Sequence, residues 1–166
     1  MSLFLRIEEL PPLTFTGFMQ RTNLLSPGIP HLWKELRQRK QEIPGCVNDF
    51  FYSVQVYDSP EYFRQFQPEQ LFDRWAAVRV TEESPVPQGM QQLESPGGLY
   101  AVFLHKGTPA QFATTAQYIF GSWLPQSGYL PDNRPHFEQI PPGYRPDDPE
   151  AEEEVWVPVR PAAAGG

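Results

Sequence analysis

Cysteine and positive charge are both scarce in this chain. A single cysteine among 166 residues excludes a framework of internal disulfide bonds and is consistent with a reducing compartment. Lysine and arginine together number 13 against 20 aspartates and glutamates, which gives a net charge of −7. The basic surface that nucleic-acid binding requires is therefore missing, and we expect no direct nucleic-acid partner. The only basic cluster has the spacing of one solvated helix face and comprises Lys34, Arg37, Arg39 and Lys40.

Long apolar runs and the common catalytic motifs are also absent. No apolar run approaches membrane-spanning length, and the amino-terminal end lacks the basic start and apolar core of a signal peptide. The glycine-rich nucleotide loops, the serine elbow of hydrolases and the paired-histidine zinc motif are missing. His31, His105 and His136 lack the spacing of zinc ligands. We therefore expect a cytoplasmic protein with no membrane partner, no metal and no cofactor.

Cys46 is a candidate nucleophile only if a histidine lies near it in the fold. A lone cysteine beside Pro44 and Gly45 is more often a small loop or core residue, and we favour that interpretation.

Aromatic residues and prolines are abundant. Aromatic side chains make up 14% of the chain and prolines number 20, against 20% charged residues. This composition is typical of a globular protein whose short elements are joined by rigid, proline-rich connectors.

The order strand, helix, strand, strand occurs twice along the chain. Alternating apolar residues predict strands, and apolar residues on one helical face predict helices. In the first half the strands are 13–21, 49–57 and 71–81 and the helix is 26–44. In the second half the strands are 99–106, 134–140 and 153–160, and a helix begins at a capping-box sequence, 108–111, with Pro109 first, and ends near residue 125.

This repeated order favours an internal structural duplication within an α+β fold over a chance recurrence. We predict a single domain over 1–160, with a first module at about 10–82, a connector at 82–97 and a second module at 98–160. The small-residue end, 161–166, is predicted to be a frayed tail.

Two carboxylates interrupt apolar strand segments. Glu138 shares a strand face with His136, and Glu154 shares one with Trp156. A buried carboxylate is unfavourable unless a cation, a hydrogen-bond network or a catalytic task compensates it. Alternatively, Glu138 pairs with Arg134 or another surface cation, and Glu154 is the third of three glutamates that enter a strand at the surface. Rings are available to line a cavity around such a charge, although most must be core: Phe18, Tyr52, Tyr100, Phe103, Trp123, Tyr129, Phe137 and Trp156.

Four segments resemble a known family. Residues 95–107 resemble the G-x-Y-A-V-F-x-H-x-G segment of GyrI-like small-molecule-binding domains, which also serve as effector-binding domains of AraC-type and BmrR-type regulators. Residues 123–129 look like the family's W-L-P-x-S-G-Y, residues 136–138 like its x-F-E, and residues 154–159 like its closing motif that ends in P-V. The chain departs from the family pattern where Ile140 stands two residues after Glu138 and an aromatic residue is frequent.

The resemblance implies two β-α-β-β modules related by a pseudo-twofold axis, forming an antiparallel sheet with two helices on one face and a central ligand cleft. It also implies that the cleft binds hydrophobic, often cationic, small molecules around a central glutamate. Glu138 is our first candidate for that glutamate and Glu154 the second. The other candidate ligand-binding residues are Tyr100, Trp123, Tyr129, Phe137, Trp156, Tyr52 and Phe18.

We thus expect a standalone member of this family that binds or sequesters lipophilic, possibly cationic compounds. A second hypothesis is a hydrolase of reactive cyclopropane-type electrophiles that uses Glu138, Glu154 and Tyr100. A third is a protein-interaction role such as gyrase inhibition through the acidic run 150–154. A link to transcription would need a separate DNA-binding regulator, since the chain has no room for a helix-turn-helix domain.

Overall fold

The computed structural model describes residues 2–26, 28–59, 67–108, 111–145 and 147–162. Pro109 and residues 163–166 of the expected tail lie outside the described residues. None of the helices in the described residues is long and apolar enough to cross a membrane.

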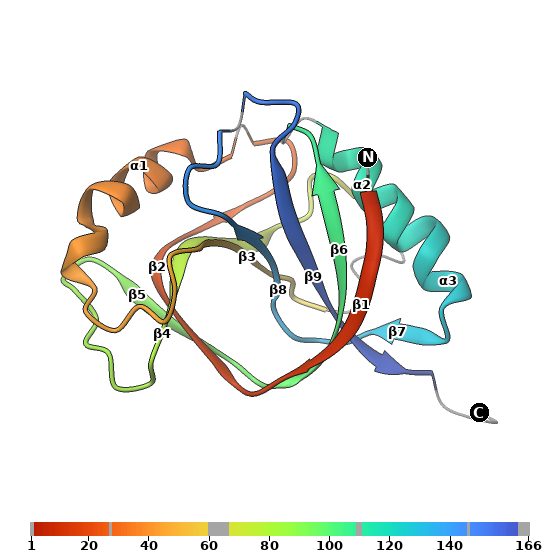
Figure 1. Cartoon of the computed structure of the whole chain (residues 1–166), viewed down its shortest axis with the longest axis horizontal. Coiled ribbons are helices and arrows are strands. Elements are labelled where there is room, and N and C mark those ends of the chain that lie inside the picture. The colour runs from red at the N-terminus through yellow and green to blue at the C-terminus, as the bar shows by residue number, and fades with distance from the viewer. Residues whose placement is uncertain (1, 27, 60–66, 109–110, 146, 163–166) are drawn as a thin grey trace.

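The fold is built on a nine-stranded sheet in which every pairing among the described residues is antiparallel (Figure 1). The strands are β1 (Ser2–Leu10), β2 (Leu13–Thr22), β3 (Phe51–Val56), β4 (Phe72–Val80), β5 (Gln91–Ser95), β6 (Gly98–Lys106), β7 (Tyr129–Pro131), β8 (His136–Ile140) and β9 (Glu152–Pro161). Their order in the sheet is β1-β6-β9-β8-β3-β4-β2-β5, and β7 pairs with β9 outside this path.

Helices follow β2 and β6. The first is α1 (Pro30–Arg39), which a 3-10 turn, Lys40–Glu42, continues. The second begins with α2 (Phe112–Gln117), passes through a π-helical segment, Tyr118–Trp123, and ends as α3 (Leu124–Gln126). The expected capping-box contact is present before α2, because the backbone N–H of Thr108 donates to the side-chain oxygen of Gln111 at 2.8 Å.

The sheet order confirms the α+β duplication. The first module contributes β2, α1, β3 and β4, the second contributes β6, α2, β8 and β9, and the central pair of the sheet is β3 with β8. Reading outward from this pair, β4 corresponds to β9 and β2 to β6. The pseudo-twofold relation therefore passes between β3 and β8.

Three strands were missed by the sequence prediction: the short β7 and the two edge strands β1 and β5. β1 precedes β2 in the chain but pairs with β6 of the second module, whereas β5 precedes β6 but pairs with β2 of the first. The modules thus exchange their outermost strands. β5 lies within the segment 82–97, which was predicted to be a connector alone.

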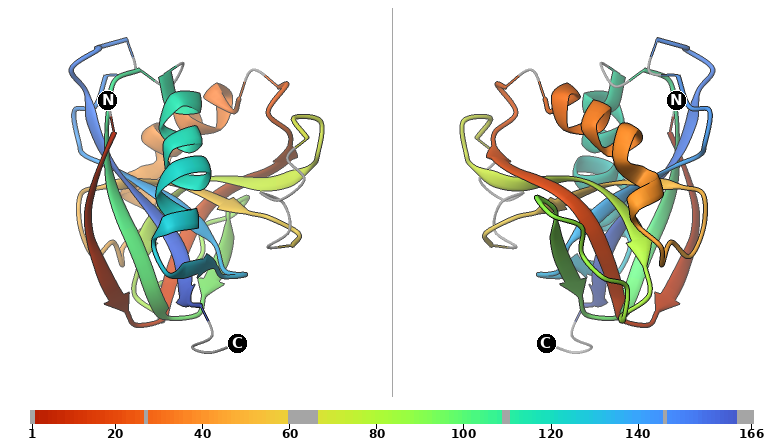
Figure 2. Two further views of the ribbon diagram at one scale, coloured as in Figure 1. Left: turned by 90° about the vertical axis from the view of Figure 1, so that its right-hand side faces the viewer. Right: turned by 90° about the vertical axis from the view of Figure 1, so that its left-hand side faces the viewer.

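Each strand has two chemically distinct faces. The face we call the helix face is covered by α1 over β2 and β4 and by the α2 segment over β6 and β9 (Figure 2). The opposite face, called the ring face, holds a core of packed aromatic side chains that includes Phe15, Tyr52, Tyr100, Phe137 and Trp156. Because side chains alternate along a strand, neighbouring residues of β3, β8 and β9 belong to different faces.

Candidate functional site

A cavity of about 1100 Å³ opens on the helix face and is lined by residues of both helices and of the strands between them. We call it the helix-face cleft. Its volume is slightly above the range of about 300–1000 Å³ that is usual for small-molecule sites. The rings that line it are Trp33, Phe51, Tyr57, Phe72, Phe112, Phe120 and Tyr144.

Glu138 lies in this cleft on the central strand pair. Its Cα partner across the sheet is Ser53 of β3, so both side chains point to the helix face. The side-chain amide of Gln55, two residues along β3, donates a hydrogen bond to the Glu138 carboxyl Oε2 at 2.7 Å. The Glu138 side chain is 7% exposed, so the sheet holds a carboxyl group in a nearly dry position.

A second carboxyl group, that of Glu153 at the start of β9, lines the same cleft and is 9% exposed. Burial raises the pKa of Glu153 to about 8, and the nearby Glu138 charge contributes to the rise, while Arg74 opposes both. The pKa of Glu138 is also raised by burial, against the opposing effects of Arg74 and of hydrogen bonds from Gln55 and Ser53. Two like groups in a low-dielectric cavity favour sharing protons over full ionisation.

Arg74 of β4 supplies positive charge to this floor. It pairs across the sheet with Gln55, which places it on the helix face. Its Nε is buried and has no hydrogen-bond partner among the described residues. One guanidinium against two carboxyl groups leaves the fully ionised floor with one negative charge in excess.

His136 completes the polar floor as a neutral group. Burial, with a smaller contribution from the Arg134 charge, lowers the pKa of His136 to about 3. Its imidazole packs edge-on against the ring of Tyr57, with centroids 4.9 Å apart, and lies 6.1 Å from the ring of Phe120. His136 therefore adds ring surface to the cleft and no positive charge near neutral pH.

The π-helical segment, Tyr118–Trp123, forms part of the cleft wall. Phe120 and Gly121 of this segment line the cavity, and nothing lies within 4 Å of the position that a Cβ on Gly121 would take. Single π-helical turns of this kind are frequent at functional sites.

The chain matches a family model over residues 4–160, that of the GyrI-like small molecule binding domain. It belongs to the GyrI-like family. The chain is 30% identical over 156 residues to the transcriptional regulator BrlR of Pseudomonas aeruginosa, and the alignment covers 93% of the chain and 54% of BrlR. This GyrI-like domain therefore spans about half the length of that relative.

Solved structures show the same fold. The C-terminal domain of EcmrR superposes with a TM-score of 0.72 and 14% identity, covering 96% of this chain and 99% of that one. The protein SAV2435, solved bound to tetraphenylphosphonium, superposes with a TM-score of 0.67 and 13% identity, covering 95% and 93%. At these identities the likeness establishes the GyrI-like fold and not the ligand.

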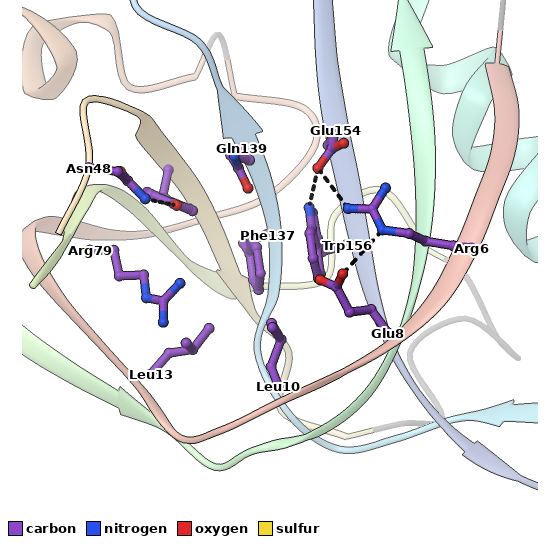
Figure 3. Close-up of a pocket in the computed structure, with 11 residues that line it drawn as sticks. Arg6, Glu8, Leu10, Leu13, Asn48, Arg79, Phe137, Gln139, Glu154 and Trp156 are labelled. Carbon is purple, nitrogen blue, oxygen red and sulfur yellow. Dashed lines mark hydrogen bonds and ion pairs between the residues drawn. The ribbon is translucent and has the colours of Figure 1, made fainter.

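Glu138 is the predicted ligand-binding residue whose side chain lies in the helix-face cleft. Phe137 also borders that cleft, but its ring packs on Trp156 in the ring-face core. Glu154, Trp156 and Tyr52 line a different, smaller cavity on the ring face, which Phe137 also borders (Figure 3). The expectation that both glutamates lie near one cleft is therefore wrong. The predicted pairing of Glu154 with Trp156 on one strand face is correct, but that face points away from the helices.

The remaining predicted rings lie in neither cavity. Tyr100 is fully buried in the ring-face core. Trp123 and Tyr129 stack on one another and pack against the core between the second helix and the sheet. Phe18 packs in the core between α1 and the sheet. Tyr100 and Phe18 thus have the core role that is usual for aromatic residues on a strand face, and Trp123 and Tyr129 are half-buried against the core of the second module.

Arg134 and Cys46 have no part in the acidic floor of the cleft. The Arg134 guanidinium does not pair with Glu138, because it donates to Asp132 and to the carbonyl oxygens of Leu99 and Val159. Burial raises the pKa of the Cys46 thiol, which is the reverse of nucleophile activation. Within the described ranges no group of three histidine, cysteine or acidic side chains could hold a metal ion.

The acidic run 150–154 does not form one acidic surface. Glu150 is exposed and pairs with Lys106 at 2.8 Å, Glu153 is buried in the cleft, and Glu154 faces the ring-face cavity.

Several residues of the cleft were missed from the sequence: Ser53, Gln55, Arg74, Tyr144 and Glu153. The sequence did contain a signal for Ser53 and Gln55. Ser53 and Gln55 alternate with the apolar Tyr52 and Val54, so β3 carries short polar side chains on the face that a helix would be expected to cover.

Proposed function

We propose that this GyrI-like domain binds lipophilic organic cations in the helix-face cleft, with Glu138 as the anchoring charge and Glu153 as its acidic partner. The observation that carries the proposal is the presence of two buried carboxyl groups at the floor of a ring-lined cavity. A lipophilic cation gains ring contacts and charge pairing together in such a site. The bound tetraphenylphosphonium of SAV2435, a protein of the same fold, supports this ligand class.

The charge balance of the floor supports a ligand with a single positive charge. Arg74 compensates one of the two carboxylates, and His136 is neutral, so one monocation neutralises the ionised floor. A neutral lipophile would contact the same rings without that gain, and an anion would meet a buried acidic pair.

The experiment is a calorimetric titration with tetraphenylphosphonium and with triphenylphosphine oxide, a neutral compound that presents similar rings. We expect Glu138→Gln to weaken tetraphenylphosphonium binding by about tenfold or more, because a charge-assisted contact is lost. Binding of the neutral compound should change by less than about twofold. The matched control is Glu154→Gln, which removes a carboxylate from the other face of the sheet. Unchanged affinity of Glu138→Gln for the cation would overturn the proposal.

Hydrolysis of an electrophile is a second candidate function, favoured by the same acidic pair. Two carboxyl groups with raised pKa values can act as general acid and general base near neutral pH. We propose Glu138 and Glu153 for these roles in place of Glu154 and Tyr100, which lie outside the helix-face cleft. Turnover of an activated cyclopropane, followed by chromatography and lost in both Glu138→Gln and Glu153→Gln, would support it. Binding of the activated cyclopropane without turnover would contradict hydrolysis and would leave cation binding as the single proposed function.

A regulatory role, a protein-interaction role and a cytoplasmic location stay predictions. The net charge of −7 offers no basic surface, so DNA contact would require a further domain or subunit.

A further inference from the structure

The ring-face cavity encloses about 380 Å³ between β1, β3, β4, β8 and β9 (Figure 3). This volume is near the lower limit of small-molecule sites and suits a ligand of one or two rings. Leu10 and Leu13, at the connection from β1 to β2, close one side of it. It lies on the opposite face of the sheet from the helix-face cleft.

One end of the cavity is arranged to receive an anion. Arg79 of β4 points its guanidinium into the space, and no carboxylate of the described residues forms an ion pair with it (Figure 3). Beside it the Tyr52 hydroxyl accepts a hydrogen bond from the side-chain amide of Asn48 at 2.9 Å. The hydroxyl proton of Tyr52 finds no acceptor among the described residues. A guanidinium and an O–H donor side by side match the two oxygens of a carboxylate.

The opposite end has the reverse charge. Arg6, Glu8 and Glu154 lie together on the far side of Phe137 from Arg79 (Figure 3). The Arg6 guanidinium is 3.3 Å from the Glu8 carboxylate and 3.5 Å from that of Glu154. One cation shared between two carboxylates leaves acceptor oxygens available and an excess of negative charge. This end therefore suits a hydrogen-bond donor on a ligand.

Aromatic and aliphatic surfaces connect the two ends. The rings of Phe137 and Trp156 are nearly parallel, at 16°, with centroids 5.3 Å apart, and both border the cavity. The Trp156 indole N–H donates to Glu154 at 3.2 Å, so the ring is fixed in place. Leu10 and Leu13 face this surface, which gives a planar ligand apolar contacts along its length.

We propose that the ring-face cavity is a second binding site, specific for a small aromatic carboxylate that carries a hydroxyl or amino group at its other end. The carboxylate pairs with Arg79 and Tyr52, the ring lies along Phe137 and Trp156, and the donor reaches Glu8 or Glu154. The site is independent of the proposed cation cleft, since the two share only Phe137 among their lining residues.

The test is an NMR titration of the isotope-labelled chain with para-hydroxybenzoate, read on the indole N–H resonance of Trp156. We expect a saturable shift of this resonance. Benzoate lacks the donor and phenol lacks the anion, so both should bind several-fold more weakly. The same titration of Glu138→Gln should match that of the unmodified chain, because Glu138 belongs to the other cavity.

Substitutions at the anion end then decide the assignment. Arg79→Gln should weaken binding by about tenfold, and Arg79→Lys should weaken it less, because a lysine keeps the charge but not the planar fork. Tyr52→Phe, which removes only the hydroxyl, should weaken it by a smaller factor than Arg79→Gln. The proposal is overturned if the Trp156 resonance does not shift up to the solubility limit, or if both Arg79→Gln and Tyr52→Phe bind as tightly as the unmodified chain.

Discussion

Glu153 and Glu154 are adjacent on β9 and line different cavities. Successive side chains of a strand point to opposite faces of the sheet, so the Glu153 carboxyl group lies on the helix face and the Glu154 carboxyl group lies beside Trp156 on the ring face. Their surroundings differ accordingly, because Glu153 is 9% exposed whereas the Glu154 side chain is 30% exposed and lies near Arg6. These two residues give a matched pair of substitutions that remove the same group from either side of one strand.

Binding of a cation in the helix-face cleft should depend on pH. Because the pKa of Glu153 is about 8, a proton occupies the acidic pair at neutral pH and must leave before both carboxylates can face the ligand. We expect tetraphenylphosphonium affinity to rise several-fold from pH 6 to pH 9, with proton release on binding. Calorimetry in buffers of different ionisation enthalpy measures that release. In Glu153→Gln the rise near pH 8 should disappear, whereas Glu154→Gln should retain it.

The same carboxyl group should make stability fall as pH rises. Between about pH 4.5 and pH 8 the unfolded chain has released the Glu153 proton while the folded chain still holds it, so raising the pH disfavours folding. Glu153→Gln removes this linkage. We expect the variant to gain about 1–3 kcal/mol relative to the unmodified chain between pH 5 and pH 8. Urea unfolding of both proteins at pH 5 and at pH 8 measures the difference in unfolding free energy between them. If that difference is the same at the two pH values, the raised pKa of Glu153 is contradicted.

His136 should stay neutral through mildly acidic pH. With its pKa lowered to about 3, the folded chain binds no proton there while the unfolded chain takes one up below about pH 6.5. His136 therefore destabilises the fold as pH falls from 6.5 towards 3. NMR titration of the imidazole C–H signals should show no midpoint for His136 above about pH 4. A midpoint near pH 6 would mean that the cleft is more hydrated than its burial indicates.

A glycine at the contact of β2 with β4 should tolerate no side chain. A Cβ on Gly17 would lie 2.0 Å from the backbone oxygen of Ala76, so the two strands would have to separate. We expect Gly17→Ala to cost about 2–4 kcal/mol in unfolding free energy. The control is Gly121→Ala, where the added methyl meets nothing within 4 Å and the change should stay below about 1 kcal/mol. If both variants lose a similar unfolding free energy, the close approach of Gly17 to Ala76 is not the cause of the loss.

Much of the fold could be predicted because its inner elements are regular. Tyr52 and Val54 alternate with polar residues in β3, and Ile29, Leu36 and Ile43 form one apolar face along α1 and the residues that flank it. The outer strands lack such a pattern. A register shift between Phe4 and Arg6 breaks the alternation of β1, and β5 is a polar edge strand in which Leu93 is the one apolar residue. Edge strands bury too little apolar surface to leave a clear period in the sequence.

The candidate site was harder to predict than the fold. Glu138 could be predicted because a carboxylate in an apolar segment is unusual in any fold. Glu153 could not, because the face of β9 that it shares with Val155 and Val157 looked like plain core. That face is indeed packed against the second helix, and Glu153, Val155 and Val157 also line the cleft. Which face the helices cover is decided by tertiary packing, and strand alternation alone leaves it open.

The exchange of β1 and β5 between the modules has a consequence for how the chain folds. Leu10 pairs with Gly98, so the amino-terminal strand finds its partner only after most of the chain has been synthesised. Until then the hairpin-like contacts of β2, β3 and β4 can form, but β1 has no edge to join. Closing so long a loop is entropically costly and slow. During synthesis, therefore, β1 has to wait for β6 of the second module, and the sheet is completed only when both modules are present.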